Sequence, residues 1–400
     1  MTVLDARRVI ESLRKGIPPN GHIREFTVGR KDEIEKITSI FGVQKPITLL
    51  LKANYGSGKT HLLRLIREVA LDSGYVVSLV TLDAKSAVRF NRMDQVFGAV
   101  CRGLETKRST ARGIGAFFDA ICGENAERGA VQDDFWDELS SDGKWDYSEC
   151  LESKGLYVAL RAWVTGDKTA RDLVEGWLSE PWVYRTQRKR LYEGLVMNLK
   201  SHFRDPRREY MFYSDEIFSF HTQGHHQSWA ALRDIHTLAL AAGFRGLVIL
   251  FDEFEDVIYN ISRTNHRQAA FWNLFQFYFG KQFPGMSFFA VTPGFVEKCK
   301  QSLAAYGEWD FGYASFDDLP TFEMTPLSVS QLLQLATKII ETHSIAYEWQ
   351  PSAKTKREIA FTVQTVGAQP LQDRVRKTIT QVVRLLDRDM EAVHESASTT

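Results

Sequence analysis

The most constraining feature of this chain is the octapeptide at residues 53–60, which reads Ala-Asn-Tyr-Gly-Ser-Gly-Lys-Thr. It follows the apolar run at 47–51 and precedes an amphipathic helix pattern at 62–70. A strand, a glycine-rich turn and a helix that opens on Gly-Lys-Thr predict a phosphate-binding loop. The turn directs backbone N–H groups inward, and the helix N-terminus adds partial positive charge. The fold must therefore contain a strand that delivers this loop to a ligand.

Two side chains of the loop have defined chemistry in such sites. Lys59 can reach the β- and γ-phosphates of a nucleotide, and the Thr60 hydroxyl can ligate Mg²⁺. Ala53 replaces the usual first glycine, which weakens the match only slightly because alanine adopts an extended backbone. The motif therefore predicts that ATP and Mg²⁺ are the cofactors. The other loop residues predicted to contact the nucleotide are Asn54, Tyr55, Gly56, Ser57, Gly58 and His61.

Composition excludes several classes of protein. The chain has 400 residues and 44% apolar residues, which is enough for a sizeable core, and its 50 basic and 50 acidic residues cancel. The four cysteines form no CxxC pair, so they fit a reducing cytoplasm better than a disulfide scaffold. The first ten residues have no long apolar core, and no apolar stretch approaches the ~20 residues of a membrane span. We predict a cytoplasmic protein that does not contact the membrane.

Five segments are predicted to be strands: 47–51, 75–82, 247–251, 288–291 and a short one at 321–324. The fully apolar runs among them are typical of central parallel strands. Because the strands alternate with helical patterns, we predict an α/β fold with a parallel sheet and helices on both faces.

The spacing of these strands also predicts the domain organisation. About 160 residues with few strand signals separate the second strand from the third, which is too long for a loop. We predict a helical insertion within a P-loop ATPase core, then a C-terminal helical lid and a flexible tail. The predicted ranges are 1–100 and 236–326 for the core, 101–235 for the insertion, 327–394 for the lid and 395–400 for the tail.

An acidic pair follows the third predicted strand. Asp252 and Glu253 stand at its carboxyl end, where open parallel sheets bind ligands. Asp252 is predicted to hold Mg²⁺, directly or through water, and Glu253 to polarise the attacking water. A solvated acidic strand end is the alternative, but a phosphate-binding loop needs an acidic Mg²⁺ partner.

The residues around this pair lead to weaker predictions. Glu255 and Asp256 are predicted to begin a helix, whose N-terminus favours negative charge. Thr292 ends the next strand, where its hydroxyl could bond the attacking water or the γ-phosphate; a plain strand terminus before Pro293 is the alternative.

Together these motifs resemble the AAA+ and related ATPases of the additional-strand class, including the origin-recognition-like and signalling branches. A glycine turn that leads into a helix just before the first strand suits one wall of an adenine pocket, and an ordinary loop and helix is the alternative. Val28, Gly29 and Arg30 in this turn resemble the segment that precedes the phosphate loop in those families. Thr292 falls where those families carry their first sensor residue.

The segment at 365–377 resembles the lid segment that carries the second sensor in the same families. The resemblance implies that Arg374 or Arg376 points at the γ-phosphate. A solvated basic helix face is the alternative for either arginine.

One departure from the oligomeric AAA+ pattern concerns the arginine that a neighbouring subunit supplies. This chain has no arginine between Arg267 and Arg357, so a homo-oligomer would lack the usual arginine finger. Arg263 or Arg267 could substitute. Otherwise the chain is a slow ATPase, or a nucleotide-gated switch that a different partner protein completes. A small-molecule kinase is disfavoured by the lid-like C-terminal region and the Asp-Glu pair.

A closer resemblance covers most of the chain. The segments at 6–16, 28–30, 53–62 and 251–255 are similar to the ATP-binding proteins of bacteriophage-exclusion (BREX) defence systems. This resemblance implies a bacterial ATPase encoded beside other defence proteins, which are its candidate partners, a helicase among them.

DNA is a further candidate partner. Residues 185–208 carry eight basic side chains, with Tyr192 and Phe203 interleaved and Tyr184 adjacent, which is the footprint expected for nucleic acid. A solvated helix face is the alternative, and the neutral net charge of the chain favours it.

Overall fold

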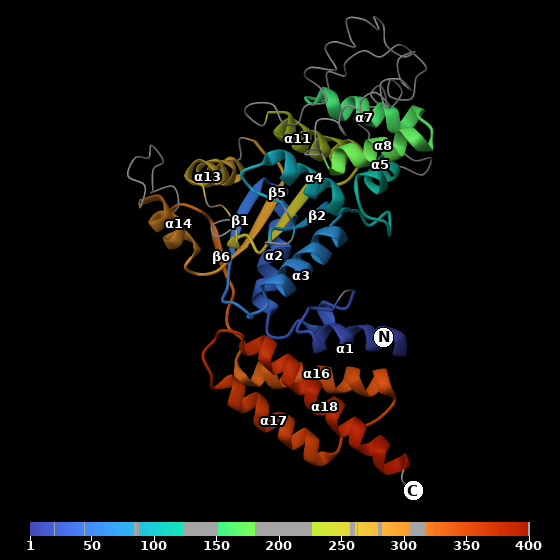
Figure 1. Ribbon diagram of the computed structural model, residues 1–400, viewed down its shortest axis with the longest axis vertical. Coiled ribbons are helices and arrows are strands. Elements are labelled where there is room, and N and C mark those ends of the chain that lie inside the picture. Colours follow the sequence, from blue (N-terminus) through green and yellow to red (C-terminus); the bar gives the residue numbers. More distant parts are fainter. Residues whose placement is uncertain are drawn as a thin grey trace, which may run out of the picture.

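The computed structural model describes residues 1–19, 21–43, 45–83, 86, 88–122, 151–180, 226–256, 261, 263–278, 282–304 and 317–398. The basic segment at 185–208 lies outside the described residues, as do the last two residues of the predicted tail. The described chain has an upper part built on a sheet and a lower part built of helices (Figure 1). None of the described helices is both long and apolar enough to cross a membrane.

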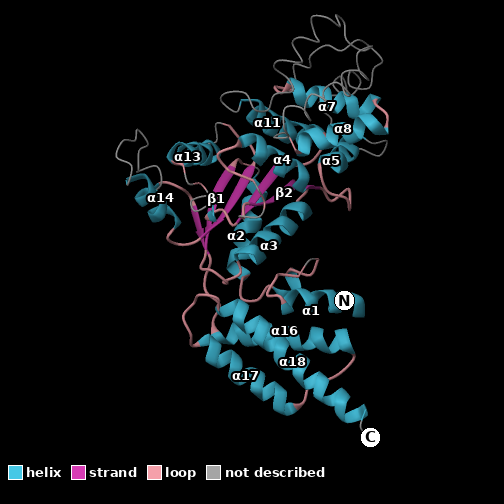
Figure 2. Cartoon of the chain, in the orientation of Figure 1, coloured by secondary structure: helices cyan, strands magenta, loops and turns pink. Residues whose placement is uncertain are grey.

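The sheet, whose strands are magenta in Figure 2, has six strands in the order β3-β2-β4-β5-β1-β6. All five predicted strands are confirmed, and the pairs among them are parallel. The sixth, β3, is antiparallel to β2 and was not predicted, because two residues carry no alternation pattern. The strands are β1 (Ile47–Lys52), β2 (Val76–Thr81), β3 (Leu104–Glu105), β4 (Leu247–Asp252), β5 (Met286–Val291) and β6 (Thr321–Glu323).

The strand order brings the phosphate-binding loop and the acidic pair to one edge of the sheet. β5 lies between β1 and β4. Lys52 is in register with Val291, and Phe251 is in register with Phe289. Because all three strands are parallel, their carboxyl ends lie side by side.

Both faces of the sheet are covered by helices, as predicted. Side chains alternate between the faces: Val248 and Leu250 share a core with α2 (Lys31–Val43) and α3 (Lys59–Asp72), whereas Ile249 and Phe251 belong to the core on the other face. Helices of that second core are α4 (Met93–Gly103), α5 (Ile114–Cys122), α7 (Lys154–Thr165), α8 (Lys168–Ser179), α11 (His226–Ala241), α13 (Thr264–Tyr278) and α14 (Phe295–Ala304).

Aromatic rings fix the second core behind the acidic pair. Phe251 of β4 stacks on Phe289 of β5, with ring centroids 4.5 Å apart and an interplanar angle of 11°. Phe254 packs edge-on against the same Phe289 at 4.7 Å. Rings packed in this way anchor the chain immediately before and after Asp252 and Glu253.

The lower part joins the two ends of the chain. Helix α1 (Val3–Arg14) packs against α16 (Val329–Tyr347) and α18 (Arg374–Ser398), with α17 (Ala353–Gly367) alongside (Figure 1). We call α1, α16, α17 and α18 the helical bundle. Capping boxes at Thr2 and Ser328 begin α1 and α16. The apolar faces of α1 and of the C-terminal helices form the core of the bundle. This core includes Ala6, Val9, Ile10, Leu13, Leu332, Ile339, Val383 and Leu386.

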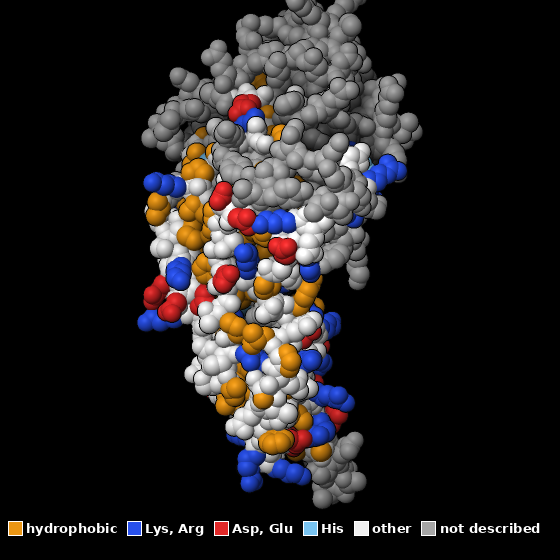
Figure 3. Space-filling view, turned by 90° about the vertical axis from the view of Figure 1, so that its left-hand side faces the viewer, with side chains coloured by type: hydrophobic (Ala, Val, Ile, Leu, Met, Phe, Trp, Pro, Cys, Tyr) orange, Lys and Arg blue, Asp and Glu red, His pale blue; other side chains and the backbone are white. Residues whose placement is uncertain are grey.

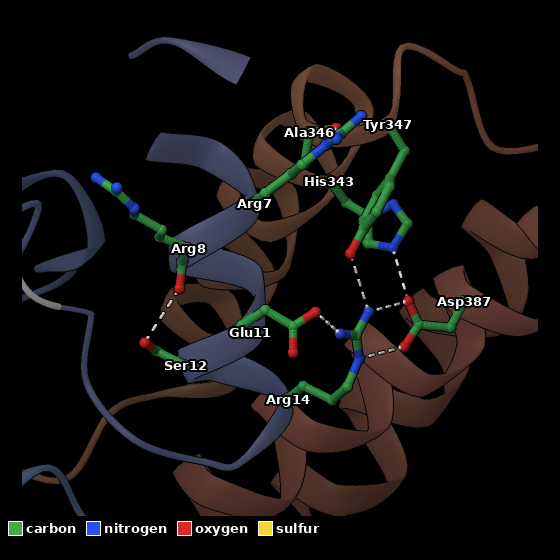
Figure 4. A network of polar contacts seen from close by, with 9 residues as sticks. All are labelled: Arg7, Arg8, Glu11, Ser12, Arg14, His343, Ala346, Tyr347 and Asp387. Carbon is green, nitrogen blue, oxygen red and sulfur yellow. Dashed lines mark hydrogen bonds and ion pairs between the residues drawn. The ribbon is translucent and has the colours of Figure 1, made fainter. Parts of the chain in front are cut away.

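A polar network inside the bundle ties α1 to the C-terminal helices (Figure 4). Arg14 donates two hydrogen bonds to the Asp387 carboxylate, at 2.9 and 2.8 Å. The ring of His343 lies 3.0 Å from the same carboxylate and accepts from the Trp349 indole at 2.8 Å. Burial alone would raise the pKa of Asp387, but the hydrogen bonds from His343 and Arg14 lower it to about 2.

Replacing Asp387 with asparagine should therefore lower the free energy of unfolding by about 1–2 kcal/mol at pH 7. The stabilisation is present above the ordinary aspartate pKa of 3.8 and is lost as the pH falls toward 2, since the folded-state pKa is the lower one. Urea unfolding of the parent and the variant should show a gap at pH 7 that narrows below pH 4. Glu391→Gln, one turn further along α18 and exposed, is the control. A gap that does not change with pH would contradict the role of the charge.

Candidate nucleotide-binding site

The loop between β1 and α3 has the backbone of a phosphate-binding turn. Gly56 and Gly58 have φ values of 64° and 101°, in the left-handed region that glycine tolerates best. A Cβ at Gly56 would lie 2.5 Å from the Cα of Asp373, so only glycine fits there. Ala53 is not among the residues with positive φ, which agrees with its tolerance at the first position of the motif.

A cavity of about 340 Å³ opens beside this loop, which is in the size range of small-molecule sites. Its walls come from the loop, the end of β4, the segment at 13–19 and the helical bundle. The predicted residues that line it are Val28, Arg30, Tyr55, Gly56, Ser57, Gly58, Lys59, Thr60, His61, Asp252, Glu253 and Arg376.

Lys59 is enclosed by polar and aromatic groups in this cavity. Its Nζ lies 3.2 Å from Glu255 Oε1 and donates to the Ala53 carbonyl, also at 3.2 Å. The ammonium lies 4.6 Å from the centre of the Tyr55 ring, within reach of a cation–π interaction. Glu255, predicted at the start of a helix, lies instead in a turn, and Asp256 is the helical residue.

Thr60 and Asp252 place two oxygen ligands together. The Thr60 hydroxyl hydrogen-bonds the Asp252 carboxylate, and the Glu253 N–H donates to it at 3.0 Å. Burial raises the pKa of Asp252, and these hydrogen bonds partly offset that effect. No group of three or more His, Cys, Asp or Glu that could hold a metal is found among the described residues. The pair fits Mg²⁺, which binds through one or two protein groups plus substrate phosphates.

Glu253 has an unusual backbone and a perturbed carboxyl group. Its φ of 55° is left-handed, a conformation that costs a residue other than glycine roughly 1–3 kcal/mol and is frequent at functional sites. Burial raises the pKa of Glu253, and the neighbouring carboxylates of Asp252, Asp256 and Asp83 raise it further. A carboxylate with a raised pKa is a stronger base toward water.

Thr292 lies at the end of β5 but not on the cavity wall. It is 6% exposed, and within the described part of the chain its Oγ1 has no hydrogen-bond partner. A buried hydroxyl in that state is uncommon, because the missing bond costs free energy. Asn54 is also off the main cavity and lines a smaller pocket with Ser57.

The segment at 28–30 contributes both a wall and an anchor. Val28 and Arg30 line the cavity, whereas Gly29 has a φ of 65° and lies against the Gln331 side chain. Arg30 pairs with Glu33 at 3.0 Å and donates a hydrogen bond to the Thr325 carbonyl. These contacts fix the path of the chain from β6 into the bundle.

His61 is a neutral member of the cavity wall. Its Nε2 lies 2.8 Å from the Thr27 hydroxyl, and burial lowers the pKa of His61 to about 4. The ring is therefore uncharged near pH 7 and can act only as a neutral hydrogen-bonding group.

The structure separates the two candidate lid arginines. Arg374 donates to the backbone carbonyls of Gly367, at 2.9 Å, and Leu327, so its guanidinium is engaged in the junction between helices. Arg376 lines the cavity, where its Cγ lies 2.9 Å from the position of a Cβ on Gly16.

Several wall residues were not predicted from the sequence. The segment at 13–19 contributes Leu13, Gly16, Pro18 and Pro19, and α18 contributes Val375 and Ile379. Gly16 and the two prolines mark a turn in the sequence, but nothing there indicates that the turn faces the loop at 53–60.

Comparison with known proteins identifies the family. A family model described as BREX system ATP-binding protein BrxC/D matches residues 3–129 and 222–399. These segments contain the phosphate-binding loop, the acidic end of β4 and the helical bundle. Searches of curated proteins and of solved structures gave no match. Because the family model covers most of the sequence, this chain belongs to the BrxC/D family of BREX-system ATP-binding proteins.

Proposed function

We propose that this chain binds Mg-ATP in the cavity beside the loop at 53–60 and hydrolyses it. One observation carries the proposal: Lys59, Thr60, Asp252 and Glu253 converge on one cavity, although two different strands deliver them. In this proposal the core comprises 1–100 and 236–326, the insertion 101–235 and the lid 327–394. Within the first of these ranges, helix α1 packs with the lid helices in the bundle and not on the sheet.

Each of the four residues has a separate task in the proposed reaction. Lys59 binds the β- and γ-phosphates as a point charge. Thr60 and Asp252 would hold Mg²⁺, which would supply charge neutralisation for the phosphates. Glu253 accepts a hydrogen bond from the attacking water and orients it. Arg376 is the lid cation on the cavity wall. Thr292 is the buried hydroxyl at the end of β5, the strand between β4 and β1.

The proposed output of hydrolysis is engagement of other defence proteins of the BREX system, or of DNA. On the face shown in Figure 3, acidic and basic side chains of the described residues are interspersed, so this face offers no continuous basic track. The proposal of DNA contact therefore relies on residues 185–208, which lie outside the described residues.

A second candidate function, a nucleotide-gated switch with little turnover, is supported by the arginine content. The chain has no arginine from 268 to 356, and Arg374 is bonded to backbone carbonyls. A neighbouring copy therefore has no arginine at the usual position with which to neutralise charge in the transition state.

Turnover measured as a function of protein concentration separates the two functions. Phosphate release from Mg-ATP should rise less than twofold per chain over a hundredfold concentration range if the chain is a switch, because no second copy completes the site. A steep rise would favour a self-assembling ATPase. The same series with double-stranded DNA added tests whether DNA is the missing activator, and a chain that binds no ATP would contradict both functions.

A further inference from the structure

Glu255 is a buried partner of the loop lysine. Its Oε1 lies 3.2 Å from Lys59 Nζ, and the two side chains are only 5% and 9% exposed. Its other oxygen, Oε2, has no hydrogen-bond partner in the part of the chain that the structure describes. Both residues line the cavity. A charge pair enclosed in this way is screened much less than one at the surface.

The same ammonium is the group that a phosphate-binding loop presents to its ligand. Nucleotide phosphates must therefore displace Glu255 from Lys59, or share Lys59 with it. Removing the lysine from the pair leaves a buried carboxylate without its cation, which is unfavourable. The observed affinity for a nucleotide is then lower than the intrinsic affinity of the loop, because the paired state competes with the bound state.

We propose that Glu255 is a positioning residue that holds Lys59 in the nucleotide-free site and sets nucleotide affinity by competing with phosphate. The inference rests on the proposed function, since it requires that the cavity accept a nucleoside diphosphate or triphosphate. It applies to ADP and ATP alike, because both carry the β-phosphate that Lys59 reaches.

The neighbouring acidic residues do not have the same contact. Lys59 influences Asp252 and Asp256 electrostatically, but the ion pair at 3.2 Å is made with Glu255. Glu253 lines the same cavity and feels the charge of Glu255, which contributes to the raised pKa of Glu253. Glu253 is therefore a matched reference: it belongs to the same acidic cluster, and the loop lysine does not depend on it.

Calorimetric titration of the full chain with Mg-ADP tests the proposal. Glu255→Gln keeps the size of the side chain and removes its charge, and it should bind ADP about tenfold more tightly than the parent. Glu253→Gln removes one carboxylate from the same cluster but keeps the Lys59–Glu255 pair, and its ADP affinity should change less than threefold. The difference between the two variants isolates the ion pair from the general negative charge of the cavity.

Unchanged or weaker ADP binding by a folded Glu255→Gln variant overturns the inference, and so does equal tightening in Glu253→Gln. If Glu255→Gln does not fold, Glu255→Asp replaces it. Aspartate keeps the charge but is one methylene shorter, so it should hold Lys59 less closely and compete less with phosphate. ADP affinity should then rise about threefold. The titration of the parent comes first. A parent chain that binds no ADP contradicts the proposed function, whereas a parent that binds ADP with no gain in the Glu255 variants contradicts only the role of Glu255.

Discussion

Lys59→Ala is expected to weaken Mg-ATP binding about 100-fold, the largest effect on affinity of any single substitution in this site. The variant loses a charge-assisted interaction with the β- and γ-phosphates. It also leaves Glu255, whose side chain is 5% exposed, as a buried carboxylate facing the phosphates without its cation. Both effects act in the same direction, and equilibrium titration with a fluorescent ATP analogue measures their sum.

Two controls are needed for this experiment. Lys31→Ala removes a lysine whose side chain is 87% exposed and which lies outside the cavity, and ATP affinity should stay within twofold of the parent. Thermal melting of both variants checks folding, because the unpaired Glu255 also lowers stability in Lys59→Ala. If a folded Lys59→Ala binds ATP as well as the parent does, the nucleotide is not held by this loop.

Glu253→Gln is expected to lower the turnover number for ATP hydrolysis by about 10²–10⁴-fold, the range associated with loss of a general base. The amide has the same size as the carboxyl group but cannot accept a proton from water. ATP affinity should change less than threefold, because Lys59, Thr60 and Asp252 remain in place. Single-turnover release of phosphate separates this loss in chemistry from any change in binding.

Asp256→Asn is the matched control for Glu253→Gln. It removes a carboxylate of the same acidic cluster, whose pKa is also raised, chiefly by burial. Its turnover should fall less than tenfold, because charge in the cavity is altered while the proposed base is kept. Equal losses in both variants would assign the effect to cavity charge and remove Glu253 from the role of base.

The sheet and the phosphate-binding loop could be predicted because their signals are local. Apolar runs at 47–51 and 247–251 are short, uninterrupted and followed at once by the loop and by Asp252. Parallel pairing then brings the carboxyl ends of the two strands to one edge of the sheet, independently of the structure of the roughly 160 residues between the second and third strands. This is why Lys59, Thr60, Asp252 and Glu253 all line one cavity.

The bundle-side wall of the cavity could not be predicted, because its signals are not local. The stripe of Ala6, Val9, Ile10 and Leu13 shows that α1 buries one face, but an apolar face does not specify its partner. The choice between Arg374 and Arg376 likewise depended on which side of α18 meets the segment at 13–19. Glu255 was missed for a related reason: its side chain reaches Lys59 from a turn, where sequence periodicity gives no direction.

The packing of α1 against α16 and α18 also affects how the chain folds during synthesis. Synthesis produces the apolar face of α1 first and the helices that cover it last, after residue 328. At about 5–20 residues per second, α1 waits on the order of tens of seconds for its partners. The apolar face of α1 stays uncovered throughout that interval, during which β1 to β6 of the sheet are synthesised as well. Docking of α1 onto α16 and α18 therefore completes the nucleotide cavity only after α18 has been synthesised.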